Sequence, residues 1–180
     1  MSDFAKFLHA NGPNPEHAQA LQLYGQFVGD WDAEIIAHAP DGTRHRAAGE
    51  IHFGWVLEGR AIQDVWMIPR PAGAPAFPIA GNWYGTTLRV YDPTIDAWRI
   101  SWIDPGRSMF RQQIGRPRGA DIMQEGTTDT GDLSRWSFTG ITADSFHWLG
   151  ESKSAAAPDW RLVVEVKARR RKAWAGRAPN

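Results

Sequence analysis

Residues 51–68 read IHFGWVLEGRAIQDVWMI, and this stretch decides the predicted fold. Glu58 and Gly59 predict the two-residue turn of a β-hairpin, with glycine where a primed turn needs a positive φ. If the strands pair directly on either side of that turn, Phe53 lies opposite Asp64 and the large apolar side chains share one face. Asp64 interrupts that face, whose apolar members are Ile51, Phe53, Trp55, Ile62, Trp66 and Ile68.

Short segments of alternating apolar and polar residues continue on both sides of this hairpin, from Trp31 onward. They predict an all-β fold, a single antiparallel β-barrel of about ten strands, because closure removes the free sheet edges and encloses a space. The proline-rich segment 69–82 is expected to form a loop at the barrel mouth. The expected strands are 30–38, 43–57, 60–68, 84–91, 97–104, 108–115, 120–127, 133–141, 145–152 and 160–168.

A short helix is expected before the barrel. Asn14 is a good N-cap, Pro15 suits the first helical position, and the helix should run to about Tyr24. We therefore divide the chain into an N-terminal helical segment that packs on the barrel, the barrel itself, and a basic tail expected to be flexible. The boundaries are 1–26, 27–170 and 171–180.

Two further strand pairs show how the register places side chains inside the barrel. Pairing Val90 with Trp98 puts the apolar residues of 84–91 and 97–104 on the inner face and Thr87 and Arg89 on the outer face. In the later pair, a three-residue loop places Trp136 opposite Gly150 and Phe138 opposite Trp148, and it sets Arg135 opposite Glu151. This second register separates an aromatic face from a polar face with a cross-strand ion pair.

The composition narrows the class of protein. Among 180 residues, Lys plus Arg and Asp plus Glu number 20 each, so charge indicates neither a nucleic-acid nor a membrane partner. No cysteine is present, which excludes disulfides and thiolate chemistry. The first residues carry no signal-peptide pattern, so a cytoplasmic location is expected. Ten tryptophans suit a wide barrel lined by rings.

The opening Gly29-Asp30-Trp31 is similar to the Gly-x-Trp opening of the calycin superfamily, which includes the lipocalins. That resemblance implies a barrel in which an arginine from 169–172 packs on Trp31. The chain also resembles the bacterial family of unknown function DUF1579, which implies a calycin-like barrel but carries no general activity to transfer. The opening and late histidine of nitrobindin, a related haem-binding barrel, are not clear here, so no cofactor is expected. The matching pieces are Leu57-Glu58-Gly59-Arg60, Tyr91-Asp92-Pro93, Trp102-Ile103-Asp104, Arg135-Trp136-x-Phe138 and Ser145-Phe146-x-Trp148.

Asp64 and Asp104 are the candidate catalytic residues. On an inward aromatic face Asp64 loses hydration, which favours its protonated form and suits a general acid or base near neutral pH. The alternatives are that Asp64 pairs with an inward arginine or that a slip at Gly54 turns it outward. Asp104 continues the Trp102 face, but it also precedes Pro105, where aspartate commonly makes a turn.

The remaining candidates are ligand-binding residues on the inferred inner faces. No histidine pair has metal-ligand spacing and no serine lies in a nucleophile elbow, so neither a metal site nor triad hydrolysis is expected. Aromatic rings with a few polar groups favour a flat, apolar or aromatic small molecule. The predicted ligand-binding residues are Phe53, Trp55, Trp66, Trp102, Gln112, Trp136 and Trp148.

Three functions follow from this pattern. The first is binding of a small apolar or aromatic metabolite in the tryptophan-lined cavity. The second is a cofactor-independent enzyme of the isomerase, cyclase or hydratase type that uses Asp64 as general acid or base. The third is a structural module that forms a homodimer through a sheet face.

Overall fold

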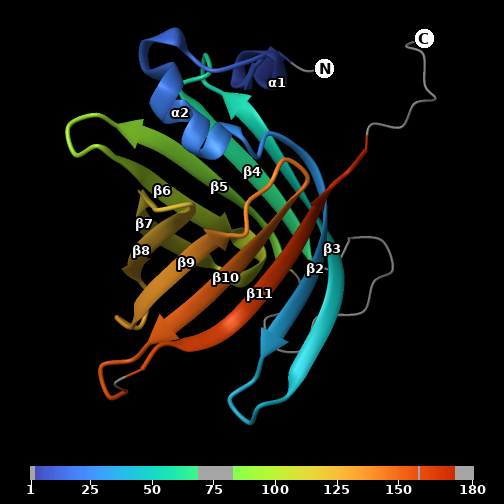
Figure 1. The fold of residues 1–180 in the computed structure, drawn as a ribbon, viewed down its shortest axis with the longest axis vertical. Helices are drawn as coiled ribbons and strands as arrows, with labels where there is room; N and C mark the ends of the chain where they lie inside the picture. Colours follow the sequence, from blue (N-terminus) through green and yellow to red (C-terminus); the bar gives the residue numbers. More distant parts are fainter. Residues whose placement is uncertain (1–2, 69–82, 158, 173–180) are drawn as a thin grey trace.

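Alternation of apolar and polar residues organises the chain from Gly29 onward into strands. The computed structural model describes residues 3–68, 83–157 and 159–172, and these form a closed antiparallel barrel, β2 to β11 (Figure 1). Each strand pairs with the next, and β11 pairs with β2 to close the barrel. The strands are β2 (Gly29–His38), β3 (Arg44–Val56), β4 (Ala61–Ile68), β5 (Trp83–Asp92), β6 (Ala97–Asp104), β7 (Met109–Arg118), β8 (Asp121–Thr127), β9 (Leu133–Thr139), β10 (Ser145–Lys153) and β11 (Arg161–Arg170).

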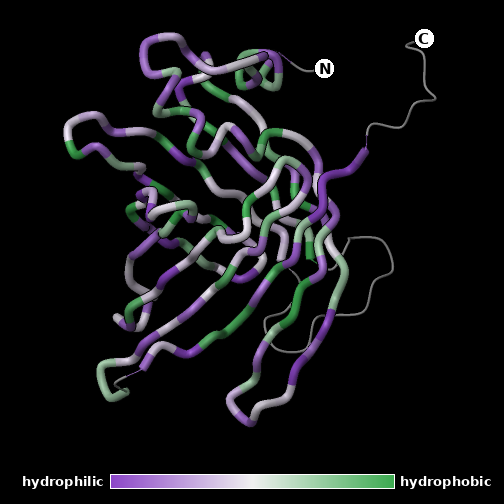
Figure 2. The backbone as a smooth tube through the Cα atoms, viewed as in Figure 1, coloured by the Kyte–Doolittle hydropathy of each residue, from purple (hydrophilic) through white to green (hydrophobic). Residues whose placement is uncertain are grey.

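The predicted all-β barrel is therefore confirmed. The expected mouth loop, 69–82, and most of the expected tail, 173–180, lie outside the described residues. Neither helix in the described part of the chain has the length and apolar run needed to cross a membrane. Hydropathy alternates along the strands, as Figure 2 shows, so that one side of each strand packs inside the barrel and the other meets solvent.

The hairpin of β3 and β4 has the predicted register. Phe53 pairs with Asp64, and the Arg60 N–H donates to the Leu57 carbonyl at 3.0 Å across the turn. Glu58 and Gly59 both have positive φ, 57° and 73°, which a primed turn requires.

Gly59 is also needed for the contact between this turn and the N-terminal segment. The Asn14 N–H donates to the Gly59 carbonyl at 3.0 Å. A Cβ at Gly59 would lie 2.1 Å from the Gly12 carbonyl oxygen, so a side chain there would push the two segments apart.

Helix α2 (Ala18–Gly25) lies across one end of the barrel (Figure 1), next to the start of β2. The 3-10 turn η1 (Pro15–His17) precedes α2, and the Asn14 side chain accepts the Glu16 N–H at 3.0 Å, as expected for its N-cap. Leu21 and Tyr24 on the inner side of α2 are buried. Helix α1 (Asp3–Leu8) and the two-residue strand β1 (His9–Ala10), which pairs with β3, complete this end.

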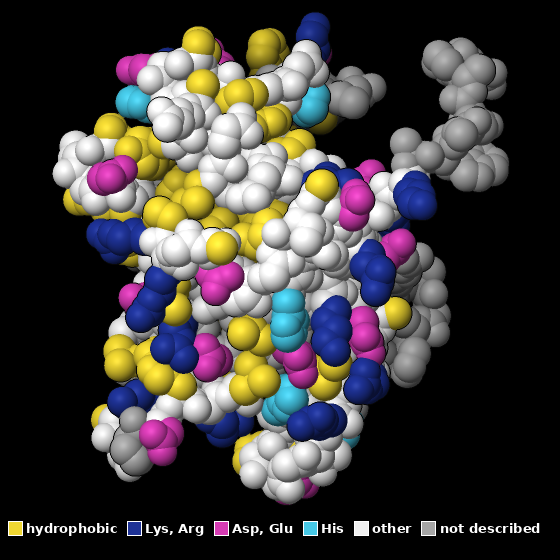
Figure 3. Space-filling view, viewed as in Figure 1, with side chains coloured by type: hydrophobic (Ala, Val, Ile, Leu, Met, Phe, Trp, Pro, Cys, Tyr) yellow, Lys and Arg dark blue, Asp and Glu magenta, His cyan; other side chains and the backbone are white. Residues whose placement is uncertain are grey.

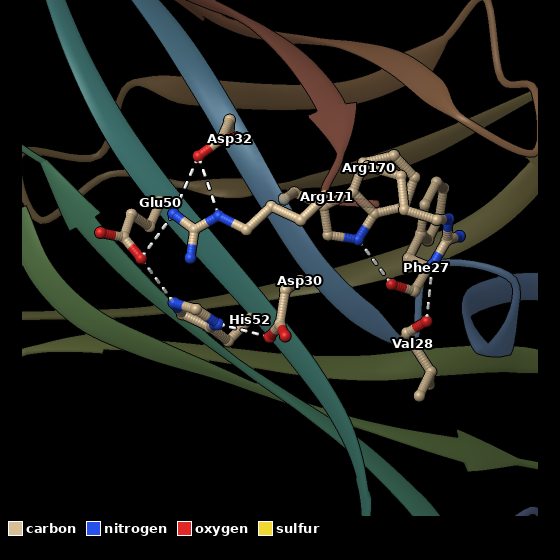
Figure 4. Close-up of polar contacts among 9 residues, drawn as sticks. Phe27, Val28, Asp30, Asp32, Glu50, His52, Arg170 and Arg171 are labelled. Carbon is tan, nitrogen blue, oxygen red and sulfur yellow. Dashed lines mark hydrogen bonds and ion pairs between the residues drawn. The ribbon is translucent and has the colours of Figure 1, made fainter. Parts of the chain in front are cut away.

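Trp31 and Arg170 fasten the first barrel strand to the last at the helix-covered end. The Trp31 indole N–H donates to the Phe27 carbonyl at 2.7 Å, and the Arg170 guanidinium carbon lies 4.1 Å from the centre of the indole ring (Figure 4). Arg170 also donates to the carbonyls of Val28, at 2.8 Å, and Ala143, at 2.7 Å. This is the arginine–tryptophan packing that the calycin resemblance implied.

The outer face of the barrel is polar and carries both signs of charge. Arg171 donates to Asp32 at 2.8 Å and lies 2.7 Å from Glu50, and Figure 4 shows these groups beside His52 on the outside of β2 and β3. Basic, acidic and histidine side chains are interleaved over much of the face that Figure 3 presents.

The later strand pair confirms one register prediction, and an earlier pair overturns another. Trp136 pairs with Gly150, and the Arg135 guanidinium donates to both Glu151 carboxylate oxygens at 2.8 and 2.9 Å, as predicted. In β5 and β6, however, Trp98 pairs with Tyr91 rather than Val90. A four-residue turn, 93–96, joins the strands where five residues were expected.

That one-residue difference moves every side chain of β5 to the other face. Arg89 is 1 % exposed and points inward, whereas Val90 is 39 % exposed on the outside. Arg89 tolerates burial because the inner face supplies a carboxylate partner, Asp64. The prediction that Thr87 and Arg89 lie outside was therefore wrong.

Candidate functional site

The barrel holds a cavity of about 330 Å³ at the end opposite α2. Its walls come from strand ends and turns that lie away from the helix, including the β8–β9 turn and the end of β10. Five tryptophans of the described chain line it, and we call them the tryptophan girdle: Trp66, Trp83, Trp102, Trp136 and Trp148.

The girdle rings contact one another in a closed sequence. Centroid distances are 6.5 Å for Trp66–Trp83, 6.4 Å for Trp83–Trp102, 6.4 Å for Trp102–Trp136, 5.6 Å for Trp136–Trp148 and 5.3 Å for Trp148–Trp66. The rings are tilted or edge-on, an arrangement that aromatic quadrupoles favour. Trp83 and Trp148 also approach to 6.4 Å, so the rings pack across the barrel as well as around it.

Sequence reasoning placed four of the five girdle members and missed Trp83. Trp83 is the first residue of β5, whereas the expected strand began one residue later. Gly85, on the same strand, lets the Trp102 ring lie against the backbone, since a Cβ there would be 2.5 Å from that ring.

Phe53 and Trp55 point into the barrel, but they lie outside the set that lines the cavity. Phe53 packs on Phe27 and Phe146, with centroids 5.6 and 6.3 Å away, and belongs to the core beneath α2. A Cβ at Gly25 of α2 would lie 2.6 Å from the Trp55 ring, so Trp55 packs directly against the helix.

Asp64 is fully buried and bound on both carboxylate oxygens. One oxygen lies 2.5 Å from Arg89 Nη1, and the other accepts the Thr87 N–H at 2.9 Å. Arg89 and Thr87 line the cavity, whereas Asp64 does not. The structure thus shows the ion-paired arrangement that was one of the two alternatives to a catalytic Asp64.

Arg89 connects Asp64 to the helix-covered end. Its guanidinium lies 5.0 Å from the centre of the Tyr24 ring, and its Nε donates to Gln124 Oε1 at 3.4 Å. The Tyr24 hydroxyl donates to the same oxygen at 3.1 Å. Burial raises the pKa of the Tyr24 phenol well above its ordinary value, and the positive charge of Arg89 opposes this only in part. We call Asp64, Arg89, Gln124 and Tyr24 the buried polar network.

Asp104 is also fully buried, at the cavity end of β6. Among the described residues neither of its carboxylate oxygens has a hydrogen-bond partner, and Arg107 Nη1 is 4.0 Å away. Burial lowers the pKa of Arg107, and the charge of Asp104 opposes that effect. Arg107 lines the cavity and Asp104 does not, so Asp104 lies behind Arg107.

The inner face of β7 differs from the prediction by one residue. Gln112 is exposed on the outside and was wrongly placed within the cavity, whereas Arg111 and Gln113 point inward opposite Trp102 and Ile100. Arg111 lines the cavity, and burial lowers its pKa, with Asp129 opposing. Gln112 was placed inward because it shares a face with the apolar Phe110, but Phe110 is 54 % exposed on the outside.

Two arginines of the cavity, Arg107 and Arg111, were therefore missed by sequence reasoning, which assigns charged side chains to the solvent face. Within residues 3–68, 83–157 and 159–172, no group of three or more histidine, aspartate or glutamate side chains is placed to hold a metal ion.

Comparisons with known proteins place the fold and not the activity. No protein-family model matches the chain, and no curated protein matches it. The fold is similar to that of Rv2717c from M. tuberculosis, with a TM-score of 0.59 and 14% identity over 86% of this chain and 99% of that one.

It is also similar to the S-type phycobiliprotein lyase CPES from Guillardia theta, with a TM-score of 0.58 and 11% identity over 85% of this chain and 93% of that one. At these identities, both likenesses show the fold alone. They agree with the single antiparallel barrel predicted from the sequence.

Proposed function

We propose that this barrel binds a small, largely apolar or aromatic molecule within the tryptophan girdle. The observation that carries the proposal is a cavity of about 330 Å³ with five tryptophans in its wall. That volume lies at the lower end of the range for small-molecule sites, which are mostly apolar with a few placed polar groups. DUF1579, the family that the sequence resembles, offers no activity to transfer, so the proposal rests on the cavity.

The position of the cavity supports a binding role. The helix-covered end is filled by side chains such as Phe27, Phe138 and Phe146, whose ring centroids lie 4.7 to 5.4 Å apart. We call the end opposite α2, where the cavity lies, the open end. Packing of the same kind at the open end would have filled the cavity. One structural neighbour is titled a phycobiliprotein lyase, which is consistent with a barrel that handles another molecule, although an identity of 11% shows the fold alone.

The buried polar network favours binding over acid–base catalysis by Asp64. A general acid or base must come within hydrogen-bond reach of the proton that it transfers. Asp64 is 0 % exposed, and Arg89 and Thr87 occupy its two oxygens on the cavity side. We propose instead that Asp64 holds Arg89 in place as part of the cavity floor.

The test uses N-phenyl-1-naphthylamine, a neutral probe whose fluorescence rises in apolar surroundings. We expect saturable binding of one probe molecule per chain. Trp136→Ala should weaken binding, because Trp136 lines the cavity, whereas Trp160→Ala should not. Trp160 is a matched control because its ring lies 4.2 Å from the guanidinium carbon of Arg135, outside the cavity-lining set. Absence of saturable binding, or equal weakening by both substitutions, would contradict the proposal.

A further inference from the structure

We infer that the cavity ligand carries an oxyanion, such as a carboxylate or sulfonate, which binds at Arg107 and Arg111 while its apolar body lies among the girdle rings. This inference rests on the proposed function and names the chemical class of the ligand. Four observations support it, and each concerns hydrogen-bond donors that no described residue accepts from.

Arg111 is the first of these donors. It points inward from β7 beside Trp102 and lines the cavity, and its guanidinium makes no hydrogen bond or ion pair with any described residue. Its Nε is buried without a partner. A buried guanidinium N–H without an acceptor costs free energy, and an oxyanion in the cavity would supply the acceptor.

Arg107 is the second donor. Its guanidinium lies 5.6 Å from the centre of the Trp83 ring, so it is held at the girdle by a cation–π contact. Asp104 Oδ2 is 4.0 Å from Nη1, an ion-pair distance that is too long for a hydrogen bond, so Asp104 accepts no hydrogen bond from Arg107. Arg107 and Arg111 both line the cavity. Burial lowers the pKa of Arg107, the charge of Asp104 opposes this, and repulsion from Arg111 lowers that pKa further. An anion between them would relieve that repulsion.

Two girdle indoles provide the third observation. Trp66 and Trp83 are 3 % and 9 % exposed, and among the described residues the N–H of each is buried without a hydrogen-bond partner. Buried tryptophan N–H groups usually find an acceptor. Trp31, at the other end of the barrel, does so through the Phe27 carbonyl.

No described acid around the cavity accepts a hydrogen bond from Arg107 or Arg111, although Asp104 makes a 4.0 Å ion-pair contact with Arg107. Glu151 is bound by Arg135 in a two-point ion pair, and Asp64 is bound by Arg89. Asp132 lines the cavity and accepts from the Thr130 hydroxyl at 3.5 Å. Asp129 acts on Arg111 only through its charge. Arg89 and Arg135 thus donate hydrogen bonds to carboxylates. The fourth observation is that no described carboxylate accepts a hydrogen bond from Arg107 or Arg111.

The experiment compares two probes with one skeleton. 8-Anilinonaphthalene-1-sulfonate is N-phenyl-1-naphthylamine with an added sulfonate, so the neutral probe reports the apolar cavity and the anionic probe adds the oxyanion. We expect the anionic probe to bind more tightly. Arg111→Gln and Arg107→Gln should each weaken it by about tenfold or more, the size expected for a lost charge-assisted hydrogen bond. Affinity for the neutral probe should change by less than about twofold, which also shows that each variant keeps its cavity.

Arg116→Gln is the matched control, because Arg116 is exposed on the same strand, β7, and does not line the cavity. It should leave both affinities unchanged. If the neutral probe binds but the anionic probe is no tighter, or ignores both cavity substitutions, the oxyanion inference is overturned and the proposed function stands. If neither probe binds saturably, the proposed function fails and the inference fails with it.

Discussion

The two ends of this barrel are built from the same strands but differ in how their polar atoms are satisfied. At the helix-covered end the Trp31 N–H and the Tyr24 hydroxyl both have partners, and Arg170 donates to backbone carbonyls. At the open end the indole N–H groups of Trp66 and Trp83 have no partner among the described residues. The helix-covered end is a packed core in which these polar groups have hydrogen-bond partners. The open end has a cavity and donors without a partner among the described residues, which are features of a binding site.

The transition between them falls at the buried polar network. Gln124 Oε1 accepts from both Tyr24 and Arg89, while its Nε2 has no partner among the described residues. Arg89 faces the core on one side, over the Tyr24 ring, and lines the cavity on the other. Arg89 therefore separates the filled core beneath α2 from the cavity and forms part of the cavity floor.

The largest expected effect separates two neighbouring aromatics of β9. Phe138 is 0 % exposed and packs between Tyr24, Phe27 and Phe146, so Phe138→Ala should lower the free energy of unfolding by about 3–5 kcal/mol. Trp136 is only half-buried, at the cavity, and Trp136→Ala should cost less than about half of that. Urea denaturation of both variants measures the difference, and equal losses would show that the two ends are packed alike.

Removing one partner of the buried ion pair should be almost as costly. Arg89→Met leaves the Asp64 carboxylate buried without its cation and should destabilise the barrel by about 3–5 kcal/mol. The double variant Asp64→Leu/Arg89→Met removes both charges and should recover much of that loss. A single-variant loss below about 1 kcal/mol would contradict the role assigned to the pair, since exposed pairs contribute that little.

A smaller effect is expected where the last strand meets the helix-covered end. Arg170→Ala removes hydrogen bonds to the carbonyls of Gln26, Val28 and Ala143 together with the stacking on Trp31, and should cost about 2 kcal/mol. Arg171→Ala, its neighbour in Figure 4, removes partly exposed ion pairs and should cost less than about 1 kcal/mol. Thermal unfolding of both variants measures the two losses of stability, and a loss for Arg171→Ala as large as that for Arg170→Ala would contradict this prediction.

The smallest expected effect appears at alkaline pH. Burial raises the pKa of Tyr24 above its ordinary value of 10.0, so the folded state keeps a proton that the unfolded state releases above pH 10. Stability from this group is complete below pH 10 and falls as pH rises further, by up to about 1.4 kcal/mol per pH unit. Tyr24→Phe should reduce that slope, whereas Tyr84→Phe, at an exposed site, should leave it unchanged. An identical slope in both variants would contradict the burial of Tyr24.

The sequence predicted registers where local chemistry selected one alignment. Gly59 set the β3–β4 turn, and the facing charges of Arg135 and Glu151 set β9–β10. The sequence predicted the wrong face where an arginine points inward and the apolar residue next to it points outward. This happened at Arg89 beside Val90 and at Arg111 beside Phe110. A signal was present, because an inward Asp64 requires a cation, and Arg89 lies on the adjacent strand β5. No such signal marked Arg111, because its buried Nε has no hydrogen-bond partner among the described residues.

The most direct test of the difference between the two ends is ¹⁹F NMR of the protein labelled with 5-fluorotryptophan and titrated with N-phenyl-1-naphthylamine. Single Trp→Phe variants assign the resonances. We predict that the signals of the girdle, in particular Trp136 and Trp148, shift with the probe, while those of Trp31 and Trp98 beneath α2 stay in place. Equal shifts at Trp31 and Trp98, or no shift in the girdle, would contradict a binding cavity at the open end.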